Sequence, residues 1–271
     1  MEPLASLTPE SLRMLGELVA QSHWNQVAED WALFHRLGTV LVIRDAQGTI
    51  VASGAVLPYG SEFAWISMIL VTPAARGQGL GAKVFAGCLQ RVRSQDRTAM
   101  LDATPAGERI YRQFGFEGLF KLTRWQRDAG DAAARAAAVP AAVDQQEIVR
   151  RDADVFGIAR AALIGDFLSR PGARCVVNAQ GFALVRAGRV AHQIGPLVAH
   201  GDDVACKLLQ QTIDALPGRV FLDLADERTA LKTTLEAAGF TPLRGFLRMA
   251  LGPARPQAAA RVQVIAGPEY G

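Results

Sequence analysis

The chain has 271 residues, half of them hydrophobic, and a formal net charge of +3 with acids and bases interspersed. This length and composition are enough for two packed cores, so two domains are expected. Apolar residues come in short bursts, far from the roughly 20 consecutive residues that a membrane-spanning helix needs. The N-terminal sequence MEPLASLTPE has an acid where a secretory signal has Lys or Arg. We expect a soluble, cytoplasmic protein without a membrane partner.

Neither the basic residues nor the cysteines indicate a special binding function. Arg91, Arg93 and Arg97 follow one predicted helix and are expected to form a solvated face, so nucleic-acid binding is not expected. The three cysteines are far apart, form no CxxC pair and have no nearby histidine at metal-ligand spacing. We expect reduced thiols, mostly in the core, and no metal site.

The first half is expected to contain two helices, a hairpin, a central strand, a helix, a strand, a helix and a last strand, in that order. The predicted ranges are 8–20 and 24–36 for the first helices, 39–43 and 50–57 for the hairpin, 63–71 for the central strand, 100–103 for the next strand and 105–114 for the helix after it. The central segment is almost continuously apolar, which is typical of a strand buried on both faces. Thr104, followed by Pro105, is the expected N-cap of the last helix.

The second half repeats this order. An offset of 124 takes the apolar stripe of the helix after the central strand onto a second helical stripe. Under the same or a similar offset, the matched residues are Gly115-Phe116 and Gly239-Phe240, Arg124 and Arg248, and Leu101-Asp102 and Leu222-Asp223. Between the halves, small residues, scattered charge and one proline indicate a linker. We predict a first domain over 1–127, a linker over 128–144, a second domain over 145–252 and a tail over 253–271.

A glycine-rich loop joins the central strand to the following helix. It has glycines at 77, 79 and 81, which allow a tight turn and a close approach of a ligand to the backbone. Free N–H groups and the positive dipole end of the helix form a site for an anion such as a pyrophosphate, and Arg76 adds a charged donor. The simpler alternative is a turn without a ligand. No acidic ribose ligand follows as in a Rossmann fingerprint, and no Gly-Lys-Ser/Thr as in a Walker A loop.

The loop 76–81, R-x-x-G-x-G after a strand that ends in valine, resembles the acetyl-CoA loop of the GNAT N-acetyltransferase superfamily. Residues 104–116, with Tyr111 four residues before Gly115-Phe116, resemble a second GNAT signature. The resemblance covers roughly residues 5–127, and HWNQ, LPYG, WISMILV and IAGPEYG make the whole layout similar to bacterial tandem GNAT proteins. It implies a duplicated α/β fold, each copy with a mixed, mostly antiparallel central sheet flanked by helices.

The resemblance also implies acetyl-CoA as the co-substrate. In that family the central strand splays from its neighbour, the pantetheine arm pairs with exposed backbone of the central strand, and the loop binds the pyrophosphate. The implied cofactor-binding residues are Ile69, Leu70, Val71, Arg76, Gly77, Gln78, Gly79, Leu80, Gly81 and Thr104.

Acetyl transfer to an amine needs a base for the mostly protonated amine and an acid for the departing thiolate. The resemblance places Tyr111 near the thioester sulfur as the acid, whereas the alternative is a tyrosine packed under the sheet with its hydroxyl in water. Many relatives carry a carboxylate in the central strand, but this strand has only Ser67 as a polar side chain in its middle. Asp102 and Asp30 remain as candidate bases, each with the alternative of a backbone hydrogen bond or an exposed charge.

Aromatic and hydrogen-bonding residues cluster in the segment that walls the acceptor pocket in GNAT domains. The segment reads His23-Trp24-Asn25-Gln26, followed by Asp30-Trp31, and it suits a small amine bound by ring faces and polar tips. The candidate substrate-binding residues are Trp24, Asn25, Asp30 and Ser67. Two tryptophans seven residues apart also fit a core stripe on one helix face, and this alternative stays open.

The second half is expected to lack acetyl-CoA chemistry. Its loop after Val198 is shorter, and Asp202 and Asp203 would repel a pyrophosphate. Leu235 stands at the position that matches Tyr111. This half is expected either to cover the acceptor pocket or to serve packing or dimerisation. Its possible contributors to the pocket are Gln193, Gly195, Asp154, Phe156 and Arg160.

Two functions therefore remain. The first is an N-acetyltransferase that transfers acetyl from acetyl-CoA to a primary amine of a small molecule or an exposed protein amine. The second is a non-catalytic acetyl-CoA sensor, which the missing strand carboxylate favours.

Overall fold

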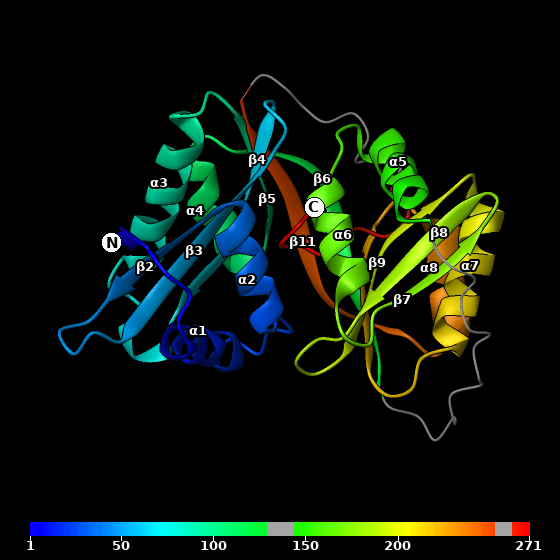
Figure 1. The fold of residues 1–271 in the computed structure, drawn as a ribbon, viewed down its shortest axis with the longest axis horizontal. Coiled ribbons are helices and arrows are strands. Elements are labelled where there is room, and N and C mark those ends of the chain that lie inside the picture. The colour runs from blue at the N-terminus through cyan, green and yellow to red at the C-terminus, as the bar shows by residue number, and fades with distance from the viewer. Residues whose placement is uncertain (129–143, 253–261) are drawn as a thin grey trace.

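The computed structural model describes residues 1–128, 144–252 and 262–271, so nearly all of the predicted linker and the first part of the tail lie outside the described residues. Both halves have the expected order of elements (Figure 1). The first half consists of β1 (Glu2–Pro3), α1 (Pro9–Gln21), α2 (Ala28–Leu37), β2 (Thr39–Arg44), β3 (Ile50–Tyr59), β4 (Phe63–Val71), the short 3-10 helix η1 (Pro73–Ala75), α3 (Leu80–Arg93), β5 (Thr98–Ala103), α4 (Pro105–Gln113) and β6 (Glu117–Arg127). The second half consists of α5 (Gln145–Phe156), α6 (Ala161–Ser169), β7 (Arg174–Asn178), β8 (Gly181–Arg186), β9 (His192–Ala199), α7 (Asp202–Asp214), β10 (Val220–Ala225), α8 (Thr229–Ala237) and β11 (Thr241–Leu251). The predicted tandem α/β fold is confirmed.

Local hydrogen bonds explain where α4 and α2 begin. The Thr104 hydroxyl accepts a hydrogen bond from the Gly107 backbone N–H at 3.2 Å, and Pro105 occupies the first position of α4, as expected. Helix α2 begins at Ala28, four residues later than predicted. The carboxylate of Asp30 accepts a hydrogen bond from the Val27 N–H at 2.7 Å and so closes the start of this helix. The HWNQ segment is therefore a connection between helices.

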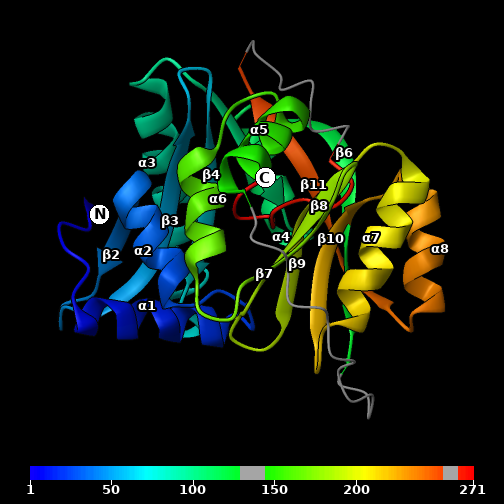
Figure 2. The ribbon, with the colours of Figure 1, turned by 45° about the vertical axis from the view of Figure 1, so that its right-hand side comes forward.

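All strands of the described residues form one mixed sheet in which the halves exchange their last strands. The strand order is β1-β2-β3-β4-β5-β11-β6-β10-β9-β8-β7. Strand β11 lies between β5 and β6, and β6 lies between β11 and β10, all in antiparallel pairs. Figures 1 and 2 show these two long strands side by side in the middle of the molecule. Each half is thus completed by a strand of the other half.

Two buried ion pairs connect the halves at this exchange. Arg124 on β6 donates two hydrogen bonds of 2.8 Å to the carboxylate of Asp223 on β10. Arg248 on β11 donates two hydrogen bonds of 2.8 Å to the carboxylate of Asp102 on β5. These four residues are the ones that the sequence repeat matches to each other, so the repeat appears in space as two equivalent crossed pairs.

The hydrophobic core has one shared part and two separate parts. Helices α3 and α4 pack on β2–β5 of the first half, and α7 and α8 pack on β8–β10 of the second. Helices α1, α2, α5 and α6 contribute to one continuous cluster that spans both halves. Tyr270, in the last described segment, lies fully buried within this shared cluster. The halves are therefore packed together through strands, helices and tail.

Each half contains a pair of parallel strands that separate after three residue pairs. Strands β4 and β5 pair only from Phe63–Trp65 to Thr98–Met100, and β9 and β10 pair only over the equivalent short stretch. Beyond the separation point a register shift interrupts the β3–β4 pairing, where Met68 has a positive φ of 55°. The Ser53 hydroxyl donates to the Met68 carbonyl at 3.0 Å and holds this bulge. The splayed strand pair expected of the first half is present.

The end of the chain fills the second of these openings. Val264 bridges Leu197 on β9 and Leu224 on β10. The Leu197 N–H donates to the Val264 carbonyl at 2.9 Å, and the Ile265 N–H donates to the Asp223 carbonyl at 3.1 Å. A Cβ at Gly195 would collide with the carbonyl of Ile265, so glycine is required for this close approach. The tail occupies the opening of the second half as an extended peptide.

Candidate active site

The glycine loop has the geometry of an open anion site. Gly77 and Gly79 have φ values of +78° and +75°, and a Cβ at either would meet no atom within 4 Å. Helix α3 begins at Leu80 without a side-chain cap. Among the described residues, no acceptor is found for the backbone N–H groups from Gln78 to Ala82. Arg76 is exposed and donates through Nε to the Val71 carbonyl at 3.2 Å. Free donors therefore line the start of this helix.

The opening between β4 and β5 begins beside this loop. Ile69, Leu70 and Val71 belong to the part of β4 that has no partner in β5, whereas Leu70 and Val71 still pair with β3 on the other side. One edge of this backbone is therefore available to a ligand. The arrangement brings the predicted cofactor residues of strand, loop and helix to one place.

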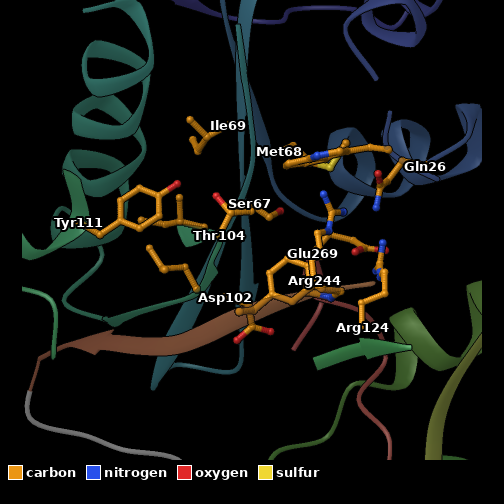
Figure 3. Close-up of a pocket in the computed structure, with 15 residues that line it drawn as sticks. Gln26, Ser67, Met68, Ile69, Asp102, Thr104, Tyr111, Arg124, Arg244 and Glu269 are labelled. Atoms are coloured by element: carbon orange, nitrogen blue, oxygen red, sulfur yellow. The ribbon is translucent and has the colours of Figure 1, made fainter. Parts of the chain in front are cut away.

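The opening leads to a cavity of about 560 Å³, part of it open to solvent. Figure 3 shows Tyr111, Thr104 and Ser67 on one side, and Gln26, Arg124, Arg244 and Glu269 on the other. Trp24 also lines the cavity. Residues of the first half, of β11 and of the tail thus share one pocket, in which the sequence had predicted Trp24, Ser67, Asp102, Thr104 and Tyr111.

Tyr111 is held by aromatic packing. Its ring centroid lies 4.4 Å from that of Phe85 and 6.3 Å from that of Phe116. The hydroxyl points toward the cavity (Figure 3). Burial raises the pKa of this hydroxyl, and the nearby Cys88 raises it further. The group therefore stays protonated at neutral pH and is able to donate a hydrogen bond or proton into the pocket.

Asp102 lies in the pocket wall, but its geometry does not fit a base. Both carboxylate oxygens accept hydrogen bonds from Arg248, and the Asp102 side chain is fully buried in this pair. Burial raises the pKa of Asp102, and the Arg248 guanidinium lowers it. Because each oxygen of this carboxylate is bound to Arg248, the side chain is held in an ion pair, which favours a structural role over that of a base. We therefore assign Asp102 a structural role and do not retain it as a catalytic residue.

Asn25 and Asp30 are turned away from the pocket and make contacts within the protein. The Asn25 amide oxygen accepts hydrogen bonds from the N–H groups of Val190 and Ala191 at 3.0 Å, so this side chain connects the halves. Asp30 accepts hydrogen bonds of 2.6 Å from Arg170 and from the Tyr270 hydroxyl. The prediction that these two residues bind substrate is not supported, because their hydrogen-bonding groups are already satisfied. Trp31, in contrast to Trp24, is a core residue.

The predicted contributors from the second half also lie elsewhere. Gln193 donates to Asp223 at 3.0 Å, and Gly195 accommodates the tail. Arg160 forms a fully buried pair with Asp152 and lies 3.6 Å from the ring centroid of Phe156. Asp154 is an exposed partner of Arg150. The second half contributes to the pocket through Arg244, Phe246, Pro268 and Glu269 instead.

Several buried polar groups around the pocket have no partner. Among the described residues, these include Ser67 Oγ, Gln26 Oε1 and Arg244 Nε. Glu269 is 7% exposed and has no hydrogen-bonded or ion-paired partner in the described part of the chain. Unsatisfied buried polar groups are uncommon in native proteins, so a group of them around one pocket calls for an explanation such as a bound water, ion or ligand. Gln26 and Glu269 belong to the segments HWNQ and IAGPEYG, which the sequence analysis noted as similar to tandem GNAT proteins. No pattern around either residue predicts that its side chain lines this pocket.

Neither a membrane-spanning helix nor a cluster of metal ligands is seen in the described ranges. No helix there has the length and apolar character to cross a membrane. No group of three or more potential metal ligands lies together in the same ranges.

Comparison with known proteins agrees with this architecture. Two family models, both described as acetyltransferase (GNAT) domains, match residues 4–124 and 148–263. A holothin acyltransferase from Pseudoalteromonas is 27% identical over 234 residues, which cover 82% of this chain and 78% of that protein. A crystal structure of a proposed acetyltransferase from Pyrococcus horikoshii has a TM-score of 0.78 at 20% identity and covers 98% of this chain and 94% of its own.

A further solved structure has the same two-part layout. A tandem GNAT protein of the clavulanic acid biosynthesis pathway has a TM-score of 0.65 at 17% identity and covers 93% of this chain and 98% of its own. At these identities the structural likeness establishes the fold. Together with the two family models, this likeness identifies each of the repeated halves as a GNAT domain. The chain belongs to the GNAT superfamily of acyltransferases and contains two GNAT domains in tandem.

Proposed function

We propose that the first GNAT domain transfers an acetyl group from acetyl-CoA to a primary amine of a small molecule. The observation that carries this proposal is the continuity of three features. The glycine loop with its free N–H groups follows the end of β4 that has no partner in β5, and the middle of β4 lines the pocket at Tyr111.

The residues at this opening fit an acyl-CoA. Open space over Gly77 and Gly79 leaves the start of α3 accessible to a pyrophosphate, and Arg76 is near enough in sequence to add a charged contact. The free edge of Ile69 to Val71 fits the amide groups of a pantetheine arm. Acetyl-CoA would supply the activated acyl group as a thioester. In the second domain the tail takes the equivalent space, which supports a single cofactor site.

Tyr111 is the proposed proton donor to the departing sulfur. Its hydroxyl stays protonated because burial raises its pKa, and packing against Phe85 fixes its direction. Ser67 and Gln26 offer partnerless polar atoms that suit hydrogen bonds to the acceptor. The pocket is enclosed by both halves and by the tail, which favours a small acceptor over a protein side chain. A relative named holothin acyltransferase supports acyl transfer, whereas the acetyl donor is our proposal.

Gly81→Glu is expected to weaken acetyl-CoA binding by about 100-fold or more, which corresponds to about 3 kcal/mol. The substitution places a negative charge where the pyrophosphate would bind, whereas a carboxylate in the first turn does not disfavour the helix itself. Titration of acetyl-CoA into the purified protein by calorimetry measures the affinity and the stoichiometry. We expect one site per chain in the wild type.

Gly81→Ala is the matched control for this experiment. A Cβ at Gly81 would lie 3.6 Å from the nearest atom, a methyl of Val71, so the fold tolerates it. Two binding sites would contradict the single-site proposal. No binding by the wild type would reject acetyl-CoA as the donor.

Tyr111→Phe is expected to lower kcat by about 100-fold, since it removes the proton donor and keeps the ring. The KM for acetyl-CoA is expected to change little, because the packing on Phe85 and Phe116 remains. Thiol release from acetyl-CoA, measured over a panel of primary amines, tests this expectation. An unchanged kcat would show that Tyr111 serves only packing.

A further inference from the structure

Two charged side chains of opposite sign line the pocket without being paired. Glu269 is 7% exposed, and in the described residues nothing hydrogen-bonds to its carboxyl. The Nε of Arg244 is buried and has no hydrogen-bond partner within residues 1–128, 144–252 and 262–271, and no ion pair joins Arg244 to Glu269. Burying an unpaired charge lowers stability, so a ligand that neutralises both groups gains favourable interactions.

The other charged groups of the pocket are already neutralised. Arg124 is bound by Asp223, and Asp102 is bound by Arg248, each through two hydrogen bonds of 2.8 Å. These pairs leave Glu269 and Arg244 as the charges that are available to a ligand in this part of the described structure. The pocket thus presents one free anion and one free cation.

We propose that the acceptor is a small molecule with both a primary amine and a carboxylate. Glu269 binds the ammonium group and takes its proton, and Arg244 binds the carboxylate. This inference rests on the proposed acyl transfer and names its base and its class of acceptor.

The tail fixes Glu269 through its neighbours on both sides. Trp65 Nε1 donates to the Pro268 carbonyl at 2.8 Å, and the Tyr59 hydroxyl donates to the Tyr270 carbonyl at 2.6 Å. Arg160 donates to the Gly271 carbonyl at 2.9 Å. The carboxylate that β4 lacks is therefore supplied by a segment about 200 residues later, which is held by Tyr59 and Trp65 of the first half and by Arg160 of the second.

Arg244 is held in a comparable way by aromatic rings. Its guanidinium lies 5.1 Å from the ring centroid of Phe246 and 5.9 Å from that of Trp24. Burial lowers the pKa of Arg244 to about 10, so this side chain remains charged at neutral pH. Stacked guanidinium groups bind carboxylates through paired N–H donors.

Burial and the surrounding positive charges act in opposite directions on the pKa of Glu269. Burial raises the pKa of Glu269, and Arg186 lowers it. The remaining groups that act on it are Asp30, Arg124, Asp223, Arg244 and Tyr270. Arg186 lines a second, adjoining pocket together with Gln26 and Glu269, where it donates to the Ala266 carbonyl and leaves its buried Nη1 without a partner among the described residues.

The protons and bonds of the acyl transfer balance with Glu269 as the base and Tyr111 as the acid. Glu269 takes one proton from the ammonium, which frees the nitrogen lone pair. That lone pair forms the new C–N bond to the acyl carbon, and the C–S bond breaks with its electrons on sulfur. Tyr111 gives its proton to sulfur and regains one from the nitrogen. The products are the amide and the free thiol, and the proton on Glu269 leaves to solvent.

The test compares matched acceptors by thiol release from acetyl-CoA. β-Alanine is compared with propylamine, and phenylalanine with phenethylamine, in a panel that contains further pairs of the same kind. The wild type is expected to prefer the amino carboxylate of a pair. Arg244→Met is expected to raise the KM for that acceptor at least about 10-fold more than it raises the KM for the paired plain amine.

Glu269→Gln is expected to lower kcat by about 100-fold or more at neutral pH. In the wild type, kcat/KM rises with pH through the raised pKa of Glu269, because the deprotonated form is active. Glu269→Gln is expected to lose this acidic limb. Glu227→Gln, the same change at an exposed residue, is the matched control and is expected to retain both rate and profile.

A second readout does not depend on turnover. In protein with 13C-labelled glutamate carboxyls, the resonance that disappears in Glu269→Gln is assigned to Glu269. It is expected to titrate at higher pH than the exposed glutamates and to shift on addition of β-alanine, but not on addition of the corresponding hydroxy acid.

The outcomes separate the two proposals. Thiol release with no amine of the panel would reject the proposed function. Release that favours plain amines in every pair would overturn the acceptor class alone. A Glu269→Gln variant that keeps its rate and acidic limb, or a Glu269 resonance that ignores β-alanine in an active protein, would overturn the role of Glu269.

Discussion

Asp102→Ala is expected to lower the free energy of unfolding by about 3–5 kcal/mol. The substitution removes both acceptors of Arg248, whose side chain is 1% exposed and would be left as an unpaired charge inside the central sheet. The cavity that alanine leaves does not offset the free-energy cost of keeping this unpaired charge out of water. Denaturant unfolding followed by circular dichroism measures the loss.

The double variant Asp102→Leu with Arg248→Met is the control. Replacing a whole buried pair by apolar residues of similar size is often neutral, so this variant is expected to regain most of the lost stability. Its thiol release is expected to stay within about 10-fold of the wild type if Asp102 is structural, because each tenfold corresponds to only about 1.4 kcal/mol. If the double variant is stable but its rate of thiol release falls by far more than this, Asp102 takes part in the reaction.

The crossed pairs explain one limit of sequence analysis. The repeat of Asp102 and Arg124 as Asp223 and Arg248 is visible by subtraction, and so is the order of helices and strands. Which arginine binds which aspartate depends on the exchange of β6 and β11, and this exchange leaves no local pattern. Strand partners far apart in the chain are chosen by global packing, so the sequence predicts the equivalent residues but not their partners.

The candidate site likewise has a part that local sequence motifs predict and a part that depends on long-range contacts. The glycine loop, β4 and Tyr111 are local motifs. The structure places the middle of β4 and Tyr111 in one pocket, and the loop follows the end of β4 that has no partner in β5. Asn25 and Asp30 were predicted to bind substrate because they lie with Trp24 in the segment that walls the acceptor pocket in GNAT domains, yet they are bound by residues about 140 to 240 positions away. Glu269 was missed because a carboxylate near the chain end has no periodicity that predicts its burial.

The tail also removes the main support for a non-catalytic sensor. That alternative depended on a central strand without a carboxylate, in which Ser67 is the polar side chain available. Glu269 lines the same pocket as Ser67 and Tyr111. Under this proposal a base and an acid can act on one ligand even though β4 supplies neither, and residues of both domains hold the tail that carries the base.

Tyr270→Ala is expected to lower the free energy of unfolding by about 3–5 kcal/mol. The Tyr270 ring stacks on Phe34 at 5.2 Å with an interplanar angle of 11°, and it meets Phe167 edge-on at 5.1 Å. It is fully buried in the cluster shared by both halves, so alanine leaves a cavity there. The same loss is expected to release Glu269 from the pocket and to lower kcat about as far as Glu269→Gln does. Unfolding curves and thiol release measure the two effects.

Tyr270→Phe separates packing from hydrogen bonding at this position. It keeps the stacked ring and removes the 2.6 Å hydrogen bond to Asp30, so the expected loss is about 1.5–3 kcal/mol. Because the Tyr59 hydroxyl still binds the backbone carbonyl of residue 270, Glu269 is expected to stay in place and the acidic limb of the pH profile to persist. If Tyr270→Ala kept full activity at a temperature where it is folded, the tail would not be the element that delivers the base, and the second domain would have no part in the reaction beyond the strand that it lends to the first.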